Sequence, residues 1–306
     1  MVAEWNDPRT VEKVTRLLEL LGEIDAAPDL EGKLALHGGT ALNLFWLDAP
    51  RLSVDIDLNY IGSVDLEELK RDRPRVEELL VRIAKGLGYR VTSGREEHAG
   101  RTFKLRFVSE DGTDDLIKID LSFLARVPLL PPERRECHFD PGFRQTYPVL
   151  QIEEMCGGKT KALLERIAVR DLFDIHQMGR LGYPKSEVGK AILVYQHSMA
   201  APFPFEIEAA RLERFTESDV SRDLLPMLRA GTKCDLALMK EEASKFIALP
   251  ARLPEAHREY LSEFSKGDFR PELLFGDMPA VLVRAEMDPV AKWKLKNLRA
   301  LLKEKF

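Results

Sequence analysis

Cysteine is scarce in this sequence, and none of its spacings could build a scaffold. The 306 residues include only Cys137, Cys156 and Cys234, with no Cys-x-x-Cys pair, so neither a disulfide framework nor a structural zinc site is expected. No uninterrupted apolar run approaches 18 residues, and the first residues lack the apolar core of a signal peptide. We therefore expect a soluble cytoplasmic protein that has no membrane partner.

Signatures of several other protein classes are missing too. No repeat with a period of 20–50 residues stands out, which argues against solenoids and propellers. There is no Gly-x-Ser-x-Gly elbow and no His-Glu-x-x-His site, and Gly157-Gly158-Lys159-Thr160 lacks the first glycine and the strand of a phosphate-binding P-loop. The formal net charge of −5 argues against a protein that coats nucleic acid by bulk positive charge, but allows a local basic patch.

The composition and the hydrophobic patterns predict an α+β protein. Apolar residues make up 44% of the chain and charged residues 32%, which is enough for a packed core, and the length suggests two domains. Strand and helix patterns mix in the first part, and from about residue 150 onward only helical patterns follow. We expect a core domain at 1–130, with a small mixed sheet and flanking helices, and a mostly helical domain at 131–306. The expected strands are 33–37, 51–60, 101–108 and 116–123, and the expected helices begin at 41 and 66.

Two carboxylates lie on one face of a predicted strand. Asp55 and Asp57 alternate with apolar residues, so both side chains leave the same side, and Asp120 lies on the polar side of another strand. Paired acids repel one another unless a cation lies between them, and Mg²⁺ prefers such oxygen ligands. The alternative is a solvated strand face, because roughly one Asp-x-Asp is expected by chance in a chain of this length.

A glycine-rich corner precedes these acids. Gly38-Gly39-Thr40 ends one predicted strand and opens a helix, where backbone N–H groups and the helix N-terminus favour an anion such as phosphate. A plain tight turn would explain the two glycines equally well. The order of strand, Gly-Gly-Thr helix and Asp-x-Asp strand is what favours a nucleotide site.

These motifs resemble the AbiEii/MenT group of nucleotidyltransferase toxins, in the DNA-polymerase-β-like superfamily. The first match is Leu36-His37-Gly38-Gly39-Thr40-Ala41-Leu42 with Arg51-Leu52-Ser53-Val54-Asp55-Ile56-Asp57-Leu58. The second is Glu153-Glu154-Met155, Lys159, Ala162-Leu163-Leu164-Glu165-Arg166 and Arg170-Asp171-Leu172-Phe173-Asp174-Ile175. Residues of about 33–60 and 150–178 carry the resemblance, with one departure at Gly157-Gly158, where better helix formers would be expected.

The resemblance implies a role for each matching residue. Mg²⁺, or Mn²⁺ in its place, would be bound by Asp55, Asp57 and Asp120. The triphosphate of an NTP would lie along Gly38, Gly39, Thr40, Arg51 and Ser53. Lys159 would pair with phosphate charge, and Asp171 would be the functional acid of the second part, with Asp174 as the other candidate.

Basic residues form two further candidate surfaces. If one helix runs from Lys159 through Arg166 to Arg170, these three side chains form a stripe that could face the triphosphate in a cleft between the two domains; an exposed ladder with Glu165 and Asp174 is the alternative. The predicted C-terminal helix carries Trp293 among cations that could bind RNA or simply be solvated. Those cations are Lys292, Lys294, Lys296, Arg299, Lys303 and Lys305, and Lys118 and Arg126 are further candidate RNA contacts.

The sequence thus predicts a metal-dependent nucleotidyltransferase that moves a nucleoside monophosphate from an NTP to a hydroxyl. The resemblance implies a toxin of a toxin–antitoxin system, with the 3′ end of tRNA as acceptor and a cognate antitoxin as partner. One alternative is the same chemistry on a small-molecule or protein hydroxyl. The other is a nucleotide- or partner-binding module without catalysis, against which Asp55, Asp57, Lys159 and Asp171 argue.

Overall fold

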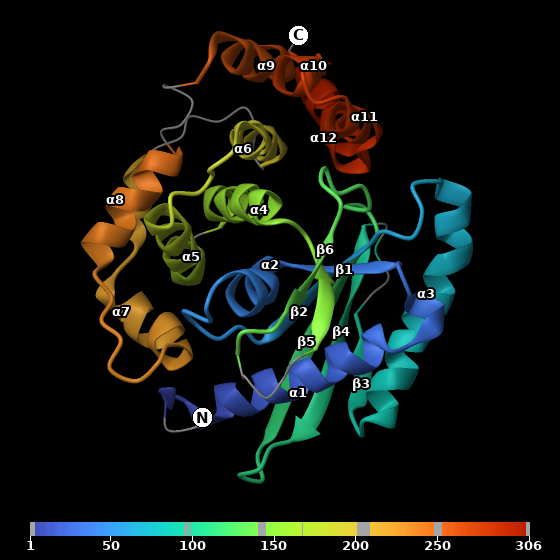
Figure 1. The fold of residues 1–306 in the computed structure, drawn as a ribbon, viewed down its shortest axis with the longest axis vertical. Helices are drawn as coiled ribbons and strands as arrows, with labels where there is room; N and C mark the ends of the chain where they lie inside the picture. The colour runs from blue at the N-terminus through green and yellow to red at the C-terminus, as the bar shows by residue number, and fades with distance from the viewer. Residues whose placement is uncertain are drawn as a thin grey trace. The chain divides into compact units, whose positions relative to one another are not determined.

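The chain forms two compact units in the computed structural model (Figure 1), which describes residues 4–94, 97, 99–139, 145–166, 168–200, 209–247 and 253–303. The first unit consists of Met1–Leu150 and Pro226–Thr232, and the second of Gln151–Leu225 and Lys233–Phe306. The first unit extends past the expected domain end at residue 130, because two later strands join its sheet. The division into domains at 130/131 stays a prediction.

A mixed seven-stranded sheet forms the centre of the first unit, in the order β3-β4-β5-β2-β1-β7-β6. Strand β2 is parallel to β5 and β1 is parallel to β7, whereas the other neighbours are antiparallel. The strands are β1 (Leu34–His37), β2 (Asp55–Tyr60), β3 (Arg90–Ser93), β4 (Gly100–Val108), β5 (Asp114–Ser122), β6 (Glu133–Glu136) and β7 (Thr146–Val149).

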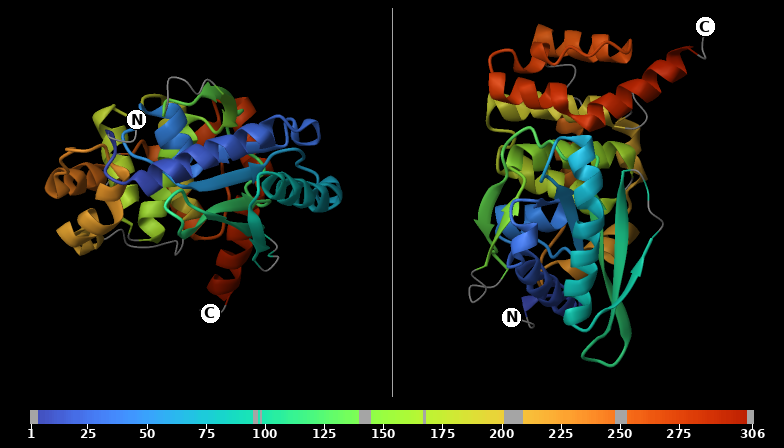
Figure 2. Two further views of the ribbon diagram at one scale, coloured as in Figure 1. Left: turned by 90° about the horizontal axis from the view of Figure 1, so that it is seen from below. Right: turned by 90° about the vertical axis from the view of Figure 1, so that its right-hand side faces the viewer.

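Two long helices of the first unit, α1 (Pro8–Asp25) and α3 (Leu66–Gly86), contact each other and pack against the sheet (Figure 2). Aspartate caps begin both: Asp7 accepts from a backbone N–H at the start of α1, and Asp65 accepts from two at the start of α3. The aromatic side of β4 faces these helices, where the Arg16 guanidinium lies 4.5 Å from the centre of the Phe107 ring. The opposite side of β4 is exposed.

A shorter helical segment opens directly from β1. It consists of α2 (Gly38–Thr40) and the wider turns of Ala41–Trp46. The side chains of residues 41–45 are buried, so this segment is anchored in the first unit behind the glycine-rich corner.

The second unit is helical, and its described residues contain no strand. The predicted absence of strands after about residue 150 is confirmed for this part of the chain. Its main helices are α4 (Ile152–Glu165), α5 (Val169–Arg180), α6 (Glu187–Met199), α7 (Glu217–Asp219), α8 (Leu236–Ile247), α9 (Glu255–Ser265), α10 (Glu272–Phe275), α11 (Pro279–Met287) and α12 (Pro289–Lys303).

The glycines that depart from the family pattern lie inside α4 without breaking it. A Cβ at Gly157 would come within 2.7 Å of the Gln196 side chain on α6, whereas Gly158 has nothing within 4 Å. Gly157 therefore allows α4 and α6 to approach closely, which offsets its low helix propensity.

The predicted α+β class is confirmed, and the expected strands and helices of residues 33–123 are present with shifts of a few residues. The patterns missed β3, β6 and β7. These strands have four residues each, and most side chains of β3 and β6 are exposed, so they lack the apolar alternation that identifies a half-buried strand.

Candidate functional site

Three predicted acids lie on one face of two adjoining strands. Asp57 on β2 is the register partner of Asp120 on the parallel strand β5, and Asp55 lies two residues before Asp57. Asp55 is also opposite Lys118, whose Nζ is 3.9 Å from an Asp55 carboxylate oxygen. The strand alternation read from the sequence therefore places these side chains together, as expected.

The glycine-rich corner contacts this acidic row directly. Gly38 has a φ of +73°, a conformation that favours glycine. A Cβ built there would lie 2.0 Å from Asp57 Oδ2, so any other residue would displace the carboxylate. The glycine is required by the close approach of the turn to Asp57 as well as by its backbone conformation.

The other residues that the sequence singled out around the corner are buried. Thr40 is buried and its hydroxyl donates to the backbone oxygen of Asp55 at 2.5 Å, which ties the start of the helical segment to β2. Arg51 is also buried, and its guanidinium donates to the Leu52 carbonyl at 2.9 Å. Gly39 and Ser53 are buried nearby in the chain. The structure thus gives Thr40 and Arg51 structural contacts; their predicted contacts with a triphosphate stay predictions.

The acidic row has the chemistry of a divalent-cation site. Three carboxylates on neighbouring backbone positions supply the hard oxygen ligands that Mg²⁺ and Mn²⁺ prefer. Within the described ranges, however, no group of three or more His, Cys, Asp or Glu side chains converges as a metal centre. The residue types and backbone placement therefore fit a cation, while the side chains are spread along the row.

A second charged group lies inside the helical unit. Lys159 Nζ is 3.0 Å from Asp171 Oδ1 and 2.7 Å from Asp174 Oδ2. The side chains of Lys159, Asp171 and Asp174 are 8%, 1% and 0% exposed. Arg166 completes the group, with Nε 2.8 Å from Asp171 Oδ2, while 65% of its own side chain remains exposed. The structure thus brings together four of the residues that the sequence singled out in this part of the chain.

Charge balance explains how two carboxylates can be buried here. Burial alone would raise the pKa of Asp171, but the positive charges of Lys159 and Arg166 outweigh burial and hold the pKa below its ordinary value. Asp171 therefore stays ionised and binds both cations.

The stripe of Lys159, Arg166 and Arg170 depended on one continuous helix, and the structure does not have that helix. Helix α4 ends at Glu165, and Arg166 has an extended backbone with φ −134° and ψ 157° before α5 begins at Val169. Lys159 and Arg166 meet because both bind Asp171, and not because of helical periodicity. Spacing arguments fail at such a break, since helical phase is not carried across an extended residue.

Helix α12 presents fewer cations than its sequence suggests. Lys294 is buried, and its ammonium donates to the carbonyl of Ala200 at the end of α6; Lys305 lies outside the described residues. A groove of about 470 Å³ along α12 is lined by Lys292, Leu295, Lys296, Arg299, Ala300 and Lys303. The exposed Trp293 belongs to the same helix.

Other singled-out residues have structural surroundings. Burial raises the pKa of the Cys156 thiol to about 12, as expected for a buried thiol. Arg126 donates to the carbonyls of Val64 and Phe123.

The structure adds one functional candidate that the sequence reasoning missed. The Thr102 hydroxyl on β4 donates to an Asp120 carboxylate oxygen, directly across the strand pair. The alternation of Thr102 with Phe103 and Leu105 gave its face, but nothing in the sequence gave its register against Asp120.

The comparisons with known proteins that gave a match both indicate nucleotidyltransferase toxins. A family model described as "Nucleotidyl transferase AbiEii toxin, Type IV TA system" matches residues 19–263. Among solved structures, the chain is similar to the nucleotidyltransferase toxin MenT4 from Mycobacterium tuberculosis H37Rv, with a TM-score of 0.64 and 17% identity over 90% of this chain and 93% of that one. A search of curated protein sequences gave no match.

Proposed function

Because the chain belongs to the AbiEii family of nucleotidyltransferase toxins, we propose that it transfers a nucleoside monophosphate from an NTP to the 3′ end of an RNA, with tRNA as the expected acceptor. The observation that carries this proposal is the row of Asp55, Asp57 and Asp120 beside the Gly38 corner. A cytoplasmic location and a cognate antitoxin that restrains the activity belong to the same proposal. No helix in the described part of the chain is both long and apolar enough to cross a membrane.

The proposed reaction is an in-line transfer at the α-phosphorus of the NTP. The acceptor hydroxyl oxygen forms a bond to that phosphorus, the bond from phosphorus to the oxygen bridging to the β-phosphate breaks, and pyrophosphate leaves. A carboxylate of the acidic row accepts the hydroxyl proton. Divalent cations bound by this row would neutralise and orient the triphosphate.

The other residues have supporting roles in this proposal. The backbone N–H groups of Gly38 and Gly39 at the start of the helical segment bind phosphate oxygens, which is chemistry suited to a helix N-terminus. Thr40 ties that corner to β2 through its hydrogen bond to the Asp55 backbone oxygen, and Arg51 and Ser53 lie along the triphosphate. Thr102 keeps Asp120 oriented by its hydrogen bond.

In the helical unit, Arg166 is the proposed phosphate contact, because it pairs with Asp171 yet keeps most of its side chain exposed. Lys159, Asp171 and Asp174 then act as the buried support that holds Arg166. The notion that Lys159 itself binds phosphate would require it to leave two carboxylates that are almost fully buried.

An RNA acceptor is supported by the groove on α12. Four cations line it and no acid does, which suits a phosphate backbone despite the net acidic chain. A small hydroxylated acceptor has no phosphate backbone with which these cations could pair.

The test uses purified protein, total tRNA, Mg²⁺ and each labelled NTP in turn, with an Asp57→Asn variant. Asp29→Asn is the matched control, because it removes one exposed carboxylate of the first unit away from the row. We expect label on tRNA with wild type and with Asp29→Asn, and its loss with Asp57→Asn.

Two results would contradict the proposal. Label that persists in Asp57→Asn would show that the acidic row is not required for the transfer. Absence of label with every NTP would exclude tRNA, and the same assay with protein and small-molecule hydroxyls would then decide between another acceptor and a binding module.

A further inference from the structure

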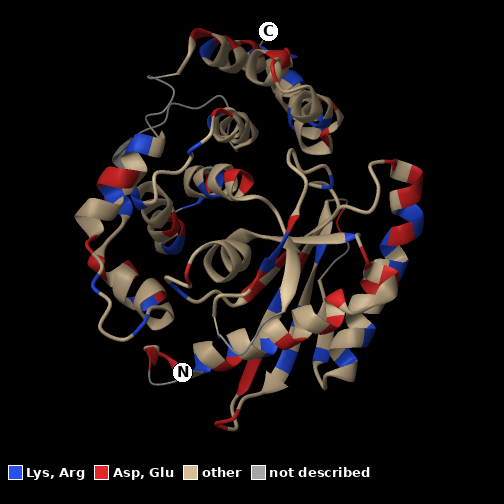
Figure 3. Cartoon of the chain, viewed as in Figure 1, with Lys and Arg blue, Asp and Glu red and all other residues tan. Residues whose placement is uncertain are grey.

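The exposed side of β4 and β5 continues the acidic row as a band of positive charge. Strand register gives its order. Asp120 lies opposite Thr102, the next pair on this face is Lys118 opposite Lys104, and Arg106 follows on β4. Figure 3 shows both basic and acidic positions along these strands of the sheet. The carboxylates and the cations therefore share one face of one sheet within the first unit.

Two of these cations make no contribution to the fold through burial or ion pairing. Lys104 and Arg106 are exposed, because the buried side chains of β4 are Phe103, Leu105 and Phe107. Neither makes an ion pair with another residue that the structure describes. At the outer edge the charge is balanced, since Arg90 on β3 pairs with Asp114 at 2.8 Å.

Like charges directly opposite each other in a sheet are destabilising. Lys104 and Lys118 are direct register partners, and Lys104 lies two residues from Arg106 on the same face. A folding role would favour an acid at one of these positions. An anionic ligand that lies across the face removes the repulsion, and the cations then contribute to binding.

We propose that this band, defined as Lys104, Arg106 and Lys118, binds the phosphate backbone of the acceptor RNA just before its reactive 3′ end. The proposal rests on the RNA acceptor proposed above. Residues two apart on a strand are separated by about 7 Å, so Arg106 lies about 13 Å along the face from the level of Asp120. That distance corresponds to roughly four stacked nucleotides at about 3.4 Å each. The 3′-terminal nucleotide would lie at the acidic row and the preceding phosphates along the band.

The same cations could instead bind the triphosphate of the NTP, and kinetics separates the two ligands. A band that binds RNA affects the KM for RNA and leaves the KM for NTP unchanged. A band that binds the triphosphate does the opposite. Lys118 stays unaltered in the test, because it is close to Asp55 and its loss would disturb both ligands.

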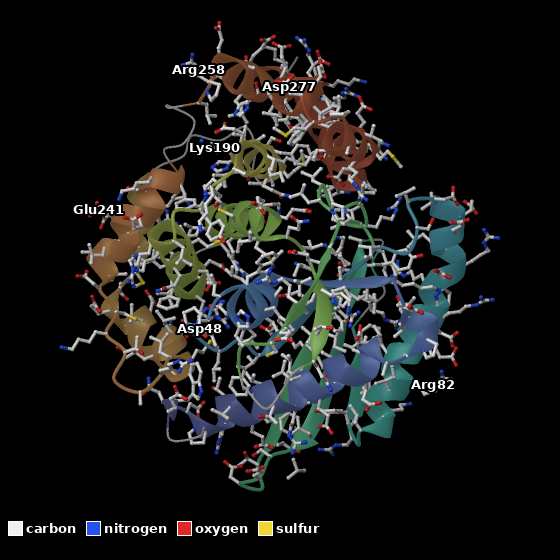
Figure 4. The ribbon with its side chains drawn as sticks, in the orientation of Figure 1. Asp48, Arg82, Lys190, Glu241, Arg258 and Asp277 are labelled. Atoms are coloured by element: carbon white, nitrogen blue, oxygen red, sulfur yellow. The ribbon has the colours of Figure 1, made fainter. Side chains whose placement is uncertain are left out.

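The test variant is Lys104→Gln/Arg106→Gln, with Arg82→Gln/Lys85→Gln as the matched control. Arg82, labelled in Figure 4, and Lys85 are exposed cations on α3, so both variants remove two positive charges from the surface of the first unit. All four side chains are exposed, so we expect both proteins to fold, with the control as stable as wild type and the band variant at least as stable, because it relieves the repulsion between Lys104 and Lys118.

The first readout is binding of end-labelled tRNA, measured by fluorescence anisotropy over a series of salt concentrations. For the band variant we expect affinity to fall roughly tenfold at 0.1 M salt, and the slope of log affinity against log salt to shrink by about 1.4 to 1.8 for two lost phosphate contacts. The control should stay within twofold of wild type. In the transfer assay the band variant should raise the KM for RNA, with kcat and the KM for NTP unchanged.

Equal binding by wild type and the band variant would overturn the proposal, as would an equal loss in the control or a change confined to the KM for NTP. These failures differ from failure of the proposed function. If tRNA is labelled but the band variant behaves like wild type, the chemistry stands and the band proposal is wrong. If tRNA is never labelled yet its binding depends on the band, the surface stands and the proposed reaction is wrong.

Discussion

Removing the buried ammonium of Lys159 gives the sharpest test of how the second unit is stabilised. Asp171 and Asp174 are almost fully buried, and Lys159 lies within 3.0 Å of both. Taking one partner from a buried ion pair leaves charge without compensation, which typically costs about 3–5 kcal/mol. Domains are stable by only about 5–15 kcal/mol. We therefore expect Lys159→Met to lose a large part of the unfolding free energy, although Arg166 still contacts Asp171.

The pH dependence of the unfolding free energy provides a second, independent test of the same reasoning. In wild type the pKa of Asp171 is lowered, so its contribution to stability is present above the ordinary value of about 3.9 and is lost as the pH falls below it. In Lys159→Met a buried carboxylate without its cation has a raised pKa. Lowering the pH from 7 to 5 should then stabilise the Lys159→Met variant by more than it stabilises wild type.

Urea unfolding followed by far-UV circular dichroism at pH 5 and pH 7 measures both effects. The double variant Lys159→Met/Asp174→Asn removes the cation together with one carboxylate, and should regain at least about 2 kcal/mol of the loss. Lys161→Met is the control, because Lys161 forms only a partly exposed pair with Glu165 on the same helix. If Lys159→Met is as stable as wild type to within about 1 kcal/mol, the buried-pair reasoning is refuted.

Three further predictions concern single residues. Gly38→Ala should abolish nucleotide transfer, measured with labelled NTP, because its Cβ displaces Asp57, whereas Gly32→Ala strains a similar φ of +67° in open space and should keep activity while losing about 1 kcal/mol. Gly158→Ala should raise the unfolding free energy by roughly 1 kcal/mol, because it fills an open helical position; an unchanged or lower melting temperature would contradict this. Burial raises the pKa of Asp288 to about 6, so stability should fall by up to about 3 kcal/mol between pH 4 and pH 6 and then level off. Asp288→Asn should remove that part of the fall in a series of urea titrations, and an unaltered profile would exclude Asp288 as its source.

The carboxylate row was predictable because it depends on local periodicity. Successive side chains of a strand alternate between two faces, so Asp55 and Asp57 had to share one. The glycine corner was also predictable as a turn. Its closeness to the Asp57 side chain was not, because this closeness depends on how β1 and β2 pair in three dimensions.

The basic residues show where local pattern stops being informative. Helical periodicity predicted a stripe through Lys159 and Arg166, but the helix breaks at Arg166, and the two residues meet through Asp171 instead. The same holds for Lys294, which the sequence places among exposed cations and the fold buries against the Ala200 carbonyl. Burial of a lysine depends on packing partners that lie far away in the chain.

The α+β class, the main strands and helices of residues 33–123, the face of each acid and the family resemblance could all be read from the sequence, since they follow from alternation, turn chemistry and short motifs. Tertiary structure alone decided the register that places Thr102 on Asp120 and lines up Lys104 with Lys118. It also decided that Lys159 is buried between two aspartates. Register and burial depend on contacts between residues distant in sequence, and no local pattern specifies which distant residues meet.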